Sequence, residues 1–305
     1  MQISTEAIES VASWMAYETF VFPRNLSLAP YDVDRDPDKA IDLMMLVACL
    51  NFAFTDFETG ETFIVQRDGE QLVDTDGMSA CLHEALERGE PLLDGAHWTT
   101  ITEGYLDTIF EGSITMPLNA ERAQILNDVG RRLVERYDGH FHTFIRDCEP
   151  AMYADGQGML ERLVREFPRF DDVSTYRGQE VQLHKLAQLA LWSLRGAELI
   201  ELRDLDRMTA FADYIVPVAL RVMGILTYSP ELEATITERG IVARDSDEEI
   251  EIRASTLVAT AQLTDAINRR RPDDRQVIIP QIDYRLWKTY HATFWPHHLT
   301  PTTMY

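Results

Sequence analysis

Apolar side chains recur with the spacing of an α-helix along most of this 305-residue chain. A surface helix shows this period because its apolar stripe packs against a core. The period predicts helices within residues 1–20 and at residues 77–89, 119–137, 156–167, 183–195, 209–223 and 250–267, with a shorter one at 283–290. Residues 41–54 form a further, strongly apolar segment. The chain is therefore expected to be mainly α-helical.

The segment at residues 57–75 breaks the helical pattern. Its side chains alternate between apolar and polar, and it carries Thr-Gly and Asp-Gly turn signals, which are typical of a β-hairpin. A short strand is also expected at residues 277–282. No repeat or low-complexity linker divides the chain, although the loops at 22–39 and 244–249 are its weakest points. We therefore expect a single compact domain over residues 1–305, with a small hairpin inserted near 57–75.

The charge balance narrows the class of ligand. Acidic residues outnumber basic ones by 51 to 28, which gives a net charge of −23. A surface this negative repels a polyanion, and duplex binding normally needs several Lys or Arg contacts to phosphates. A small anionic ligand stays open, because a few local cations can hold one phosphate. The sequence thus disfavours a nucleic-acid polymer as partner, and it indicates no oligomeric state.

Cysteine usage and hydropathy point to the cytoplasm. The three cysteines, at positions 49, 81 and 148, are widely spaced and odd in number, which fits neither a disulfide framework nor a zinc site. The first 20 residues include acidic side chains and no basic stretch, unlike a signal peptide. No apolar run reaches the length of a membrane span. We expect a cytoplasmic protein with no membrane association.

Lone charges in apolar segments are the clearest site candidates, because the sequence contains no standard catalytic or phosphate-binding motif. Asp213 stands among apolar residues in the segment 209–217, Lys185 in 183–194 and Asp283 in 277–287. Each could face solvent, and Asp213 could instead cap a helix. A buried carboxylate is costly unless it is paired, so a buried position would indicate function. The neighbouring His297 and His298 lack the helical spacing of metal ligands, so neither a metal nor another cofactor is expected.

Nine sequence blocks that run in order along the chain resemble the queuosine salvage proteins, which are queuosine 5′-phosphate N-glycosidases. The blocks are LNFAF at 50–54, HWTTIT at 97–102, SITMPLNAERAQILNDVG at 113–130, KLAQ at 185–188, MTAFADYIVP at 208–217, VMGILTYS at 222–229, EIEIRASTL at 249–257, IDYRLW at 282–287 and PHHLTPTTMY at 296–305. Together they cover roughly residues 40–305. The chain departs from the family pattern in residues 22–30, and it has Leu299 and Pro301 where basic residues are expected.

The resemblance implies a helical fold similar to the helix-hairpin-helix DNA glycosylases. It also implies a small nucleotide substrate, queuosine 5′-monophosphate with queuosine itself as an alternative, whose hydrolysis releases queuine and ribose 5-phosphate for salvage into tRNA. Cleavage of a ribose–base bond passes through an oxocarbenium-like state, which a carboxylate near C1′ stabilises and an acid on the departing base assists. Asp213 is therefore assigned to C1′, as electrostatic partner or nucleophile, and Asp283 to the 7-deazaguanine base or its ammonium arm.

The other contacts are assigned by side-chain chemistry. Aromatic rings can stack on the flat base, and cations or imidazoles can hold the phosphate. The expected stacking residues are Phe211, Tyr214 and Trp287, the expected phosphate ligands are Lys185 and His298, with His297 as an alternative, and Asn51 and Tyr305 are expected at the sugar or the base. For each aromatic residue, a place in the core is the competing interpretation.

Two other functions are weighed. A non-catalytic protein that binds queuine or its nucleotide would keep the binding residues and release no product. A DNA-repair glycosylase would need a basic surface and would bind damaged duplex in a salt-sensitive way. The presence of Asp213 favours an enzyme over the first alternative, and the negative charge disfavours the second.

Overall fold

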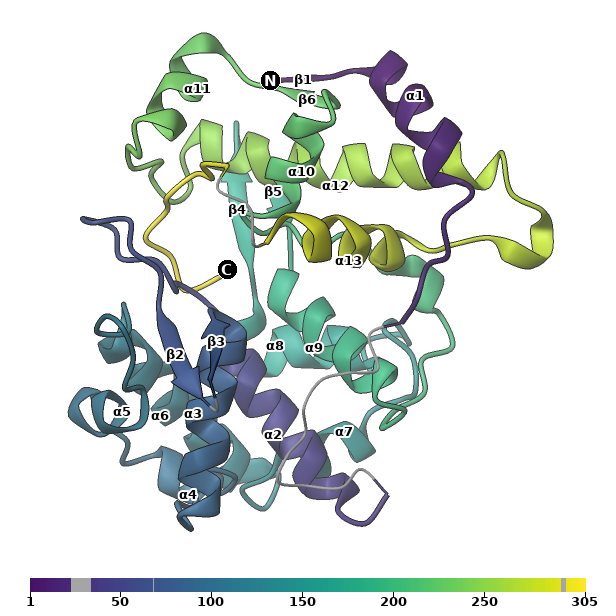
Figure 1. Ribbon diagram of the computed structural model, residues 1–305. Coiled ribbons are helices and arrows are strands. Elements are labelled where there is room, and N and C mark those ends of the chain that lie inside the picture. The colour runs from purple at the N-terminus through teal and green to yellow at the C-terminus, as the bar shows by residue number, and fades with distance from the viewer. Residues whose placement is uncertain (23–33, 68, 292–294) are drawn as a thin grey trace. The chain divides into compact units, whose positions relative to one another are not determined.

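The computed structural model describes residues 1–22, 34–67, 69–291 and 295–305, and it is mainly helical with three two-stranded sheets in these residues (Figure 1). This confirms the predicted fold class. The likeness to DNA glycosylases stays a prediction. The chain groups into two compact units: Met1–Pro23, Asp172–Gln188 and Asp204–Pro301 form unit 1, and Arg24–Asp171, Leu189–Arg203 and Thr302–Tyr305 form unit 2. The single domain over residues 1–305 also stays a prediction.

Unit 1 is built mostly from helices. Its elements are β1 (Gln2–Ile3), α1 (Thr5–Met15), β4 (Val173–Tyr176), β5 (Gln179–Gln182), the first turn of α9 (Lys185–Gly196), η2 (Leu205–Arg207), α10 (Val216–Val222), β6 (Leu226–Thr227), α11 (Pro230–Thr237), α12 (Asp247–Asn268), η3 (Asp273–Arg275) and α13 (Ile279–Tyr290). Strand β1 pairs antiparallel with β6, and β4 pairs antiparallel with β5.

Helix α12 is the centre of unit 1, with α1 and α13 packed along it (Figure 1). Its buried side chains include Ile252, Ala259 and Leu263, each with 0% exposure, and they join a core to which α1, α10, α11 and α13 contribute. Ser246 caps the helix by accepting the Glu249 N–H at 3.2 Å. Its first turn is acidic, which suits the partial positive charge of a helix N-terminus.

A buried ion pair ties the start of the β4–β5 hairpin to α12. The Arg253 guanidinium donates to both carboxylate oxygens of Asp172, at 3.1 and 2.5 Å, and both side chains are at most 1% exposed. The Asp172 carbonyl accepts the Leu183 and His184 N–H groups, which fixes the chain just before α9. Burial alone would raise the pKa of Asp172, but the charges of Arg253 and Arg244 outweigh it and hold that pKa below its ordinary value.

Unit 2 holds the remaining elements. They are α2 (Pro37–Leu50), β2 (Ile64–Arg67), β3 (Glu70–Val73), α3 (Thr75–Glu87), α4 (Gly95–Trp98), α5 (Glu103–Ile109), α6 (Asn119–Arg136), α7 (Phe141–Asp147), α8 (Met159–Glu166), η1 (Pro168–Phe170) and the rest of α9. Strands β2 and β3 form the predicted hairpin, with Val65 opposite Leu72. Helices α4 and α6 pack closely because Gly130 lacks a Cβ, which would lie 2.6 Å from the Gly95 carbonyl oxygen.

Two of the predicted elements differ in the structure, and one element was not predicted. The strand at 277–282 is wrong, because Pro280 and the bond from the Ile278 N–H to Gln281 start helix α13 there. The helix at 209–223 is shorter than predicted and begins at Val216, and a hairpin at Val173–Gln182 was not predicted. The loop at 22–39 lies largely outside the described residues. Over the described residues, no helix has both the length and the apolar character needed to cross a membrane.

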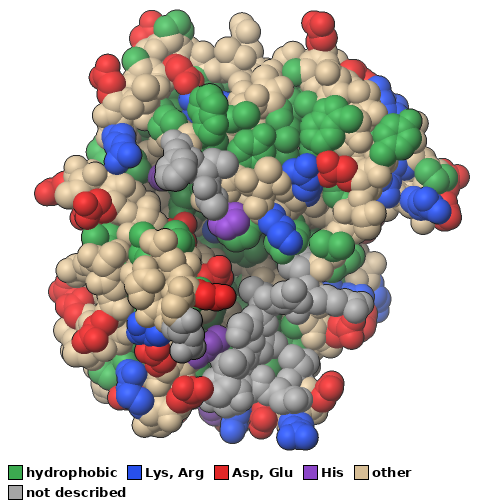
Figure 2. Space-filling view, in the orientation of Figure 1, with side chains coloured by type: hydrophobic (Ala, Val, Ile, Leu, Met, Phe, Trp, Pro, Cys, Tyr) green, Lys and Arg blue, Asp and Glu red, His purple; other side chains and the backbone are tan. Residues whose placement is uncertain are grey.

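The surface carries the negative charge in a dispersed form. Acidic side chains spread over the face that Figure 2 shows, and the basic ones lie among them. The net charge of −23 arises because acidic residues outnumber basic ones in the sequence.

Replacing Arg253 with Met should destabilise the protein by about 3–5 kcal/mol, because it leaves the Asp172 carboxylate buried without its main partner. The matched change Arg244→Ala should cost about 1 kcal/mol or less, since that side chain is 21% exposed. Urea unfolding at neutral pH measures both. The Asp172 pKa is lower in the folded state, so the pair contributes above about pH 4 and the contribution is lost as the pH falls through that pKa. A difference between wild type and Arg253→Met that persists unchanged in acid would contradict this account.

Candidate active site

The segment before α10 has no regular secondary structure, which corrects the prediction of one helix over 209–223. Pro217 is the reason: a proline inside a helix lacks the N–H and clashes with the carbonyl four residues earlier, here that of Asp213. Pro217 instead stands at the start of α10, where a missing N–H costs little. Asp213 therefore lies in irregular backbone just before a helix, not on a helix face.

Three side chains hold this irregular segment. Gln188 accepts the Thr209 N–H at 2.8 Å, Asp283 accepts the Phe211 N–H at 2.8 Å, and the Arg253 Nε donates to the Ala212 carbonyl at 2.9 Å. All three side chains are buried. Backbone groups away from regular structure need such partners when they are buried. The segment is thus fixed in place by side chains from α9, α12 and α13.

Asp213 caps α10 with its side chain. Its Oδ1 accepts the N–H groups of Ile215 and Val216, both at 2.9 Å, which are among the first unpaired donors of the helix. The side chain is 7% exposed. Burial raises the pKa of Asp213 above its ordinary value, while the Lys185 charge and the two amide donors act in the opposite direction. The sequence left open whether Asp213 caps a helix or is buried, and in the structure it does both.

Asp283 is a second buried carboxyl in the same unit. It lies on α13 with 2% exposure, and its Oδ2 accepts the Phe211 N–H. Burial raises its pKa well above the ordinary value, and the negative charge of Asp213 raises it further, against the Phe211 amide and Lys185. Two interacting carboxyls of this kind lose their protons in separate steps. The apparent pKa values therefore belong to the pair.

Lys185 supplies the positive charge of this group. It is the first residue of α9 and is 6% exposed, so it is not a surface lysine. Its ammonium attracts both carboxylates and lowers the pKa of each. The three lone charges that the sequence singled out are therefore brought together, as two carboxyls and one ammonium coupled by their electric fields.

The predicted aromatic residues occupy three different environments. Phe211 is buried at 4% exposure. The Tyr214 ring lies 4.5 Å from the His297 ring, and Trp287 stacks on His291 at 4.5 Å with an interplanar angle of 10°. Trp287 follows Asp283 by one helical turn on α13, so the two share a helix face. Their stacking on a base stays a prediction.

His298 is buried at 3% exposure, and burial lowers its pKa to about 3. It is therefore neutral at physiological pH, so any contact that it makes with a phosphate is a hydrogen bond without a formal charge. The tail around it is fixed by the Val242 N–H, which donates to the Leu299 carbonyl at 2.9 Å. Its assignment to the phosphate stays a prediction.

Asn51 and Tyr305 lie in unit 2, whereas the other predicted site residues lie in unit 1. Asn51 ends α2, and its Oδ1 accepts the Thr75 hydroxyl at 2.8 Å. The Tyr305 carbonyl accepts the Ala53 N–H at 3.4 Å. The buried Arg122 binds the carbonyls of Leu50 and Phe52 and so fixes the backbone on both sides of Asn51. Tyr305 thus contacts Ala53, two residues after Asn51, and the ligand contacts of both site residues stay predictions.

Arg253 and Gln188 were not among the predicted site residues. Neither side chain is a carboxyl or an aromatic ring of the kind expected at the site, but each binds the backbone of the segment before Asp213. A signal was present for Arg253, which is a lone cation between Ile252 and Ala254 in a block shared with the family. Gln188 ends the KLAQ block, and nothing in its own pattern indicates that it binds a backbone segment 21 residues away.

Comparison with known proteins identifies the family of this chain. A profile described as queuosine salvage protein matches residues 31–305. A protein of Sphaerobacter thermophilus named queuosine 5′-phosphate N-glycosylase/hydrolase is 37% identical over 235 residues, which cover 75% of this chain and 71% of that one. Proteins of the same name from Schizosaccharomyces pombe and Mus musculus are 28% and 26% identical, over 81% and 82% of this chain and 73% and 76% of theirs. This chain belongs to the queuosine salvage protein family.

Proposed function

We propose that this protein hydrolyses the N-glycosidic bond of queuosine 5′-phosphate and releases queuine and ribose 5-phosphate. Its relatives are named for this activity. The observation that carries the proposal is the pair of buried carboxyls, Asp213 and Asp283, beside the Lys185 ammonium. Buried groups with shifted pKa values that interact with one another are typical of catalytic sites.

Asp213 is the carboxylate that we place at C1′. The reaction breaks the bond between C1′ and the base nitrogen, adds water to C1′ and leaves a proton on the base. Positive charge develops at the sugar as the bond breaks, and an ionised carboxylate stabilises it. The nearby lysine and the two amide donors favour the ionised form of Asp213. In a site from which water is excluded, such an interaction is stronger than in solution.

Asp283 is the acid that we place at the base. Because its pKa is well above the ordinary value, it can stay protonated while Asp213 is ionised. A protonated carboxyl can donate to an acceptor on the 7-deazaguanine or supply the proton that the departing base needs. An ionised Asp283 would instead be required to pair with the ammonium arm. The raised pKa thus favours the base over the arm as the group that Asp283 contacts.

We place the reaction in the cytoplasm, with a free nucleotide rather than a nucleic-acid polymer as substrate. All three cysteines are buried and unpaired, which suits a reducing compartment. The net charge of −23 opposes binding of a polyanion. A phosphate on a single nucleotide needs only local donors, for which we propose Lys185 and His298.

The direct experiment incubates the protein with queuosine 5′-phosphate and separates the products by chromatography. We expect stoichiometric release of queuine and ribose 5-phosphate. Tight nucleotide binding with no product after hours would overturn the proposal and favour the non-catalytic binding protein.

Asp213→Asn should lower kcat by about 10³-fold or more, because the carboxylate charge at C1′ is removed. The asparagine Oδ1 can still accept the Ile215 and Val216 N–H groups, so the cap of α10 and the melting temperature should be kept. The matched control is Asp206→Asn at an exposed position of η2, which should leave kcat unchanged. A near-normal rate in Asp213→Asn would remove this residue from the mechanism.

The pH profile of kcat/KM should be bell-shaped. Activity rises as Asp213 ionises, with a midpoint above the usual Asp range near 4, and falls when Asp283 loses its proton. Asp283→Asn keeps an acceptor for the Phe211 N–H but has no proton to give. It should therefore lower kcat about 100-fold and flatten the alkaline limb of the remaining activity. An alkaline limb that survives this substitution would assign it to another group.

Lys185→Gln separates two roles of the lysine. If the ammonium supports the carboxyls, its loss should move the acid limb to higher pH and lower kcat, because the charge that lowers both pKa values is gone. If it binds only the phosphate, KM for queuosine 5′-phosphate should rise and the pH profile should stay in place. Queuosine, which has no phosphate, serves as the control substrate, since its KM should then be unaffected.

A further inference from the structure

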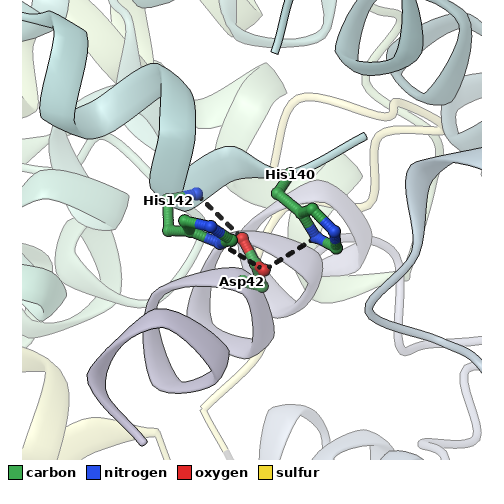
Figure 3. A group of neighbouring side chains, drawn as sticks. All are labelled: Asp42, His140 and His142. Atoms are coloured by element: carbon green, nitrogen blue, oxygen red, sulfur yellow. Dashed lines mark hydrogen bonds and ion pairs between the residues drawn. The ribbon is translucent and has the colours of Figure 1, made fainter. Parts of the chain in front are cut away.

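Three side chains of unit 2 with metal-ligand chemistry meet at one point. Asp42 comes from α2, His140 stands just before α7, and His142 lies in its first turn (Figure 3). The Asp42 Oδ2 lies 3.1 Å from the His140 Nδ1 and 2.8 Å from the His142 Nδ1. One ligand atom of each residue lies within 4.8 Å of the others, so the three can face a common centre.

The Asp42 carboxylate is held in one orientation. Its Oδ1 accepts the backbone N–H of His142 at 2.8 Å, which leaves Oδ2 toward the two imidazoles. The two imidazole rings stack with centroids 4.9 Å apart. The carboxylate side chain is 5% exposed, against 35% for His140 and 20% for His142. The group is thus rigid on the protein side and open to solvent through the histidines.

We propose that Asp42, His140 and His142 form a binding site for a divalent transition metal, with Zn²⁺ as the ion that fits best. Two imidazole nitrogens and one carboxylate oxygen are a common zinc donor set, with water in the fourth position. Zinc bonds of 2.0–2.1 Å place neighbouring ligand atoms roughly 3.3 Å apart. The nitrogen–oxygen separations of 3.1 and 2.8 Å are close to that value.

A second carboxylate lies beside the site. Histidines that bind a metal commonly direct their other ring nitrogen at a carboxylate. The His142 Nε2 lies 4.0 Å from the Asp38 Oδ2, an ion-pair contact rather than a hydrogen bond, and Asp38 is itself fixed by Arg146. Burial also raises the pKa of Asp42, a cost that a bound cation would offset.

The metal would act as a structural link within unit 2. It would join α2 to the start of α7, two segments about 100 residues apart in the sequence. Asp213, Asp283 and Lys185 all belong to unit 1, so the proposal does not rest on the proposed glycosidase activity. It also replaces the expectation of no metal, which considered only His297, His298 and the cysteines.

The test begins with the full-length protein, stripped of metal by dialysis against a chelator and titrated with Zn²⁺ in a calorimeter. We expect one saturable site per chain. His140→Ala and His142→Ala should each weaken binding by about 100-fold or more, and Asp38→Asn by about 10-fold. His83→Ala on α3, outside the group, is the control and should bind as the wild type does. Saturating Zn²⁺ should raise the wild-type Tm by roughly 3–6 °C and leave the Tm of His142→Ala unchanged.

Co²⁺ gives a readout that does not depend on any variant. Its visible d–d absorption reports coordination by nitrogen and oxygen, and addition of Zn²⁺ should abolish it. Absence of saturable binding of either ion to the wild type would overturn the proposal. The same holds if the histidine variants bind Zn²⁺ normally, or if they lower the Tm equally with and without Zn²⁺, which would mean that the three residues form a hydrogen-bonded clamp only.

Discussion

The ion pair between Arg253 and Asp172 is the contact on which the arrangement of unit 1 depends. One guanidinium binds both oxygens of Asp172 and, through its Nε, the carbonyl of Ala212. It therefore joins three segments far apart in the sequence: the start of a hairpin, the long helix α12 and the irregular segment before α10. A buried ion pair contributes little net stability compared with an apolar pair, but removing one partner is costly. The Arg253 guanidinium matters here because it fixes the position of the backbone beside Asp213.

The pKa values of Asp213 and Asp283 depend on their burial and on the charge of Lys185. Without a nearby cation, burial would raise the pKa of both carboxyls and keep both protonated. A cation close to both would lower both pKa values and leave both carboxyls ionised. Burial raises the pKa of both carboxyls, that of Asp283 well above its ordinary value, while Lys185 acts on both in the opposite direction and Asp213 receives two amide bonds against one for Asp283. In the proposed mechanism these surroundings give two side chains of one chemical type different roles.

The sequence predicted the parts of the fold that follow from local rules. Helix α6 has a clear apolar period, and the β2–β3 hairpin has its turn residues in the expected place. Helix α12 was expected at 250–267 and spans Asp247–Asn268, although its buried face includes Glu249 and Arg253. The prediction over 209–223 is wrong because Pro217 requires a break that the apolar period does not show. The sequence indicated Lys185, Asp213 and Asp283 because each is a lone charge in an apolar segment, and burying a charge costs free energy. Arg253, which acts on backbone, and the Asp42 group, whose members lie about 100 residues apart, depend on tertiary contacts that no local pattern encodes.

The cap that Asp213 provides for α10 has a consequence for how it can act. With Oδ1 committed to two backbone amides, the carboxylate can present only Oδ2 to a ligand. In the proposed mechanism its plane is set by the backbone before α10 rather than by the substrate, so the sugar would approach from one direction. The two amides also favour the ionised form of the carboxylate, against the effect of its burial. Selectivity for one face of the ribose would then follow from two backbone amides, before any side chain touches the hydroxyls.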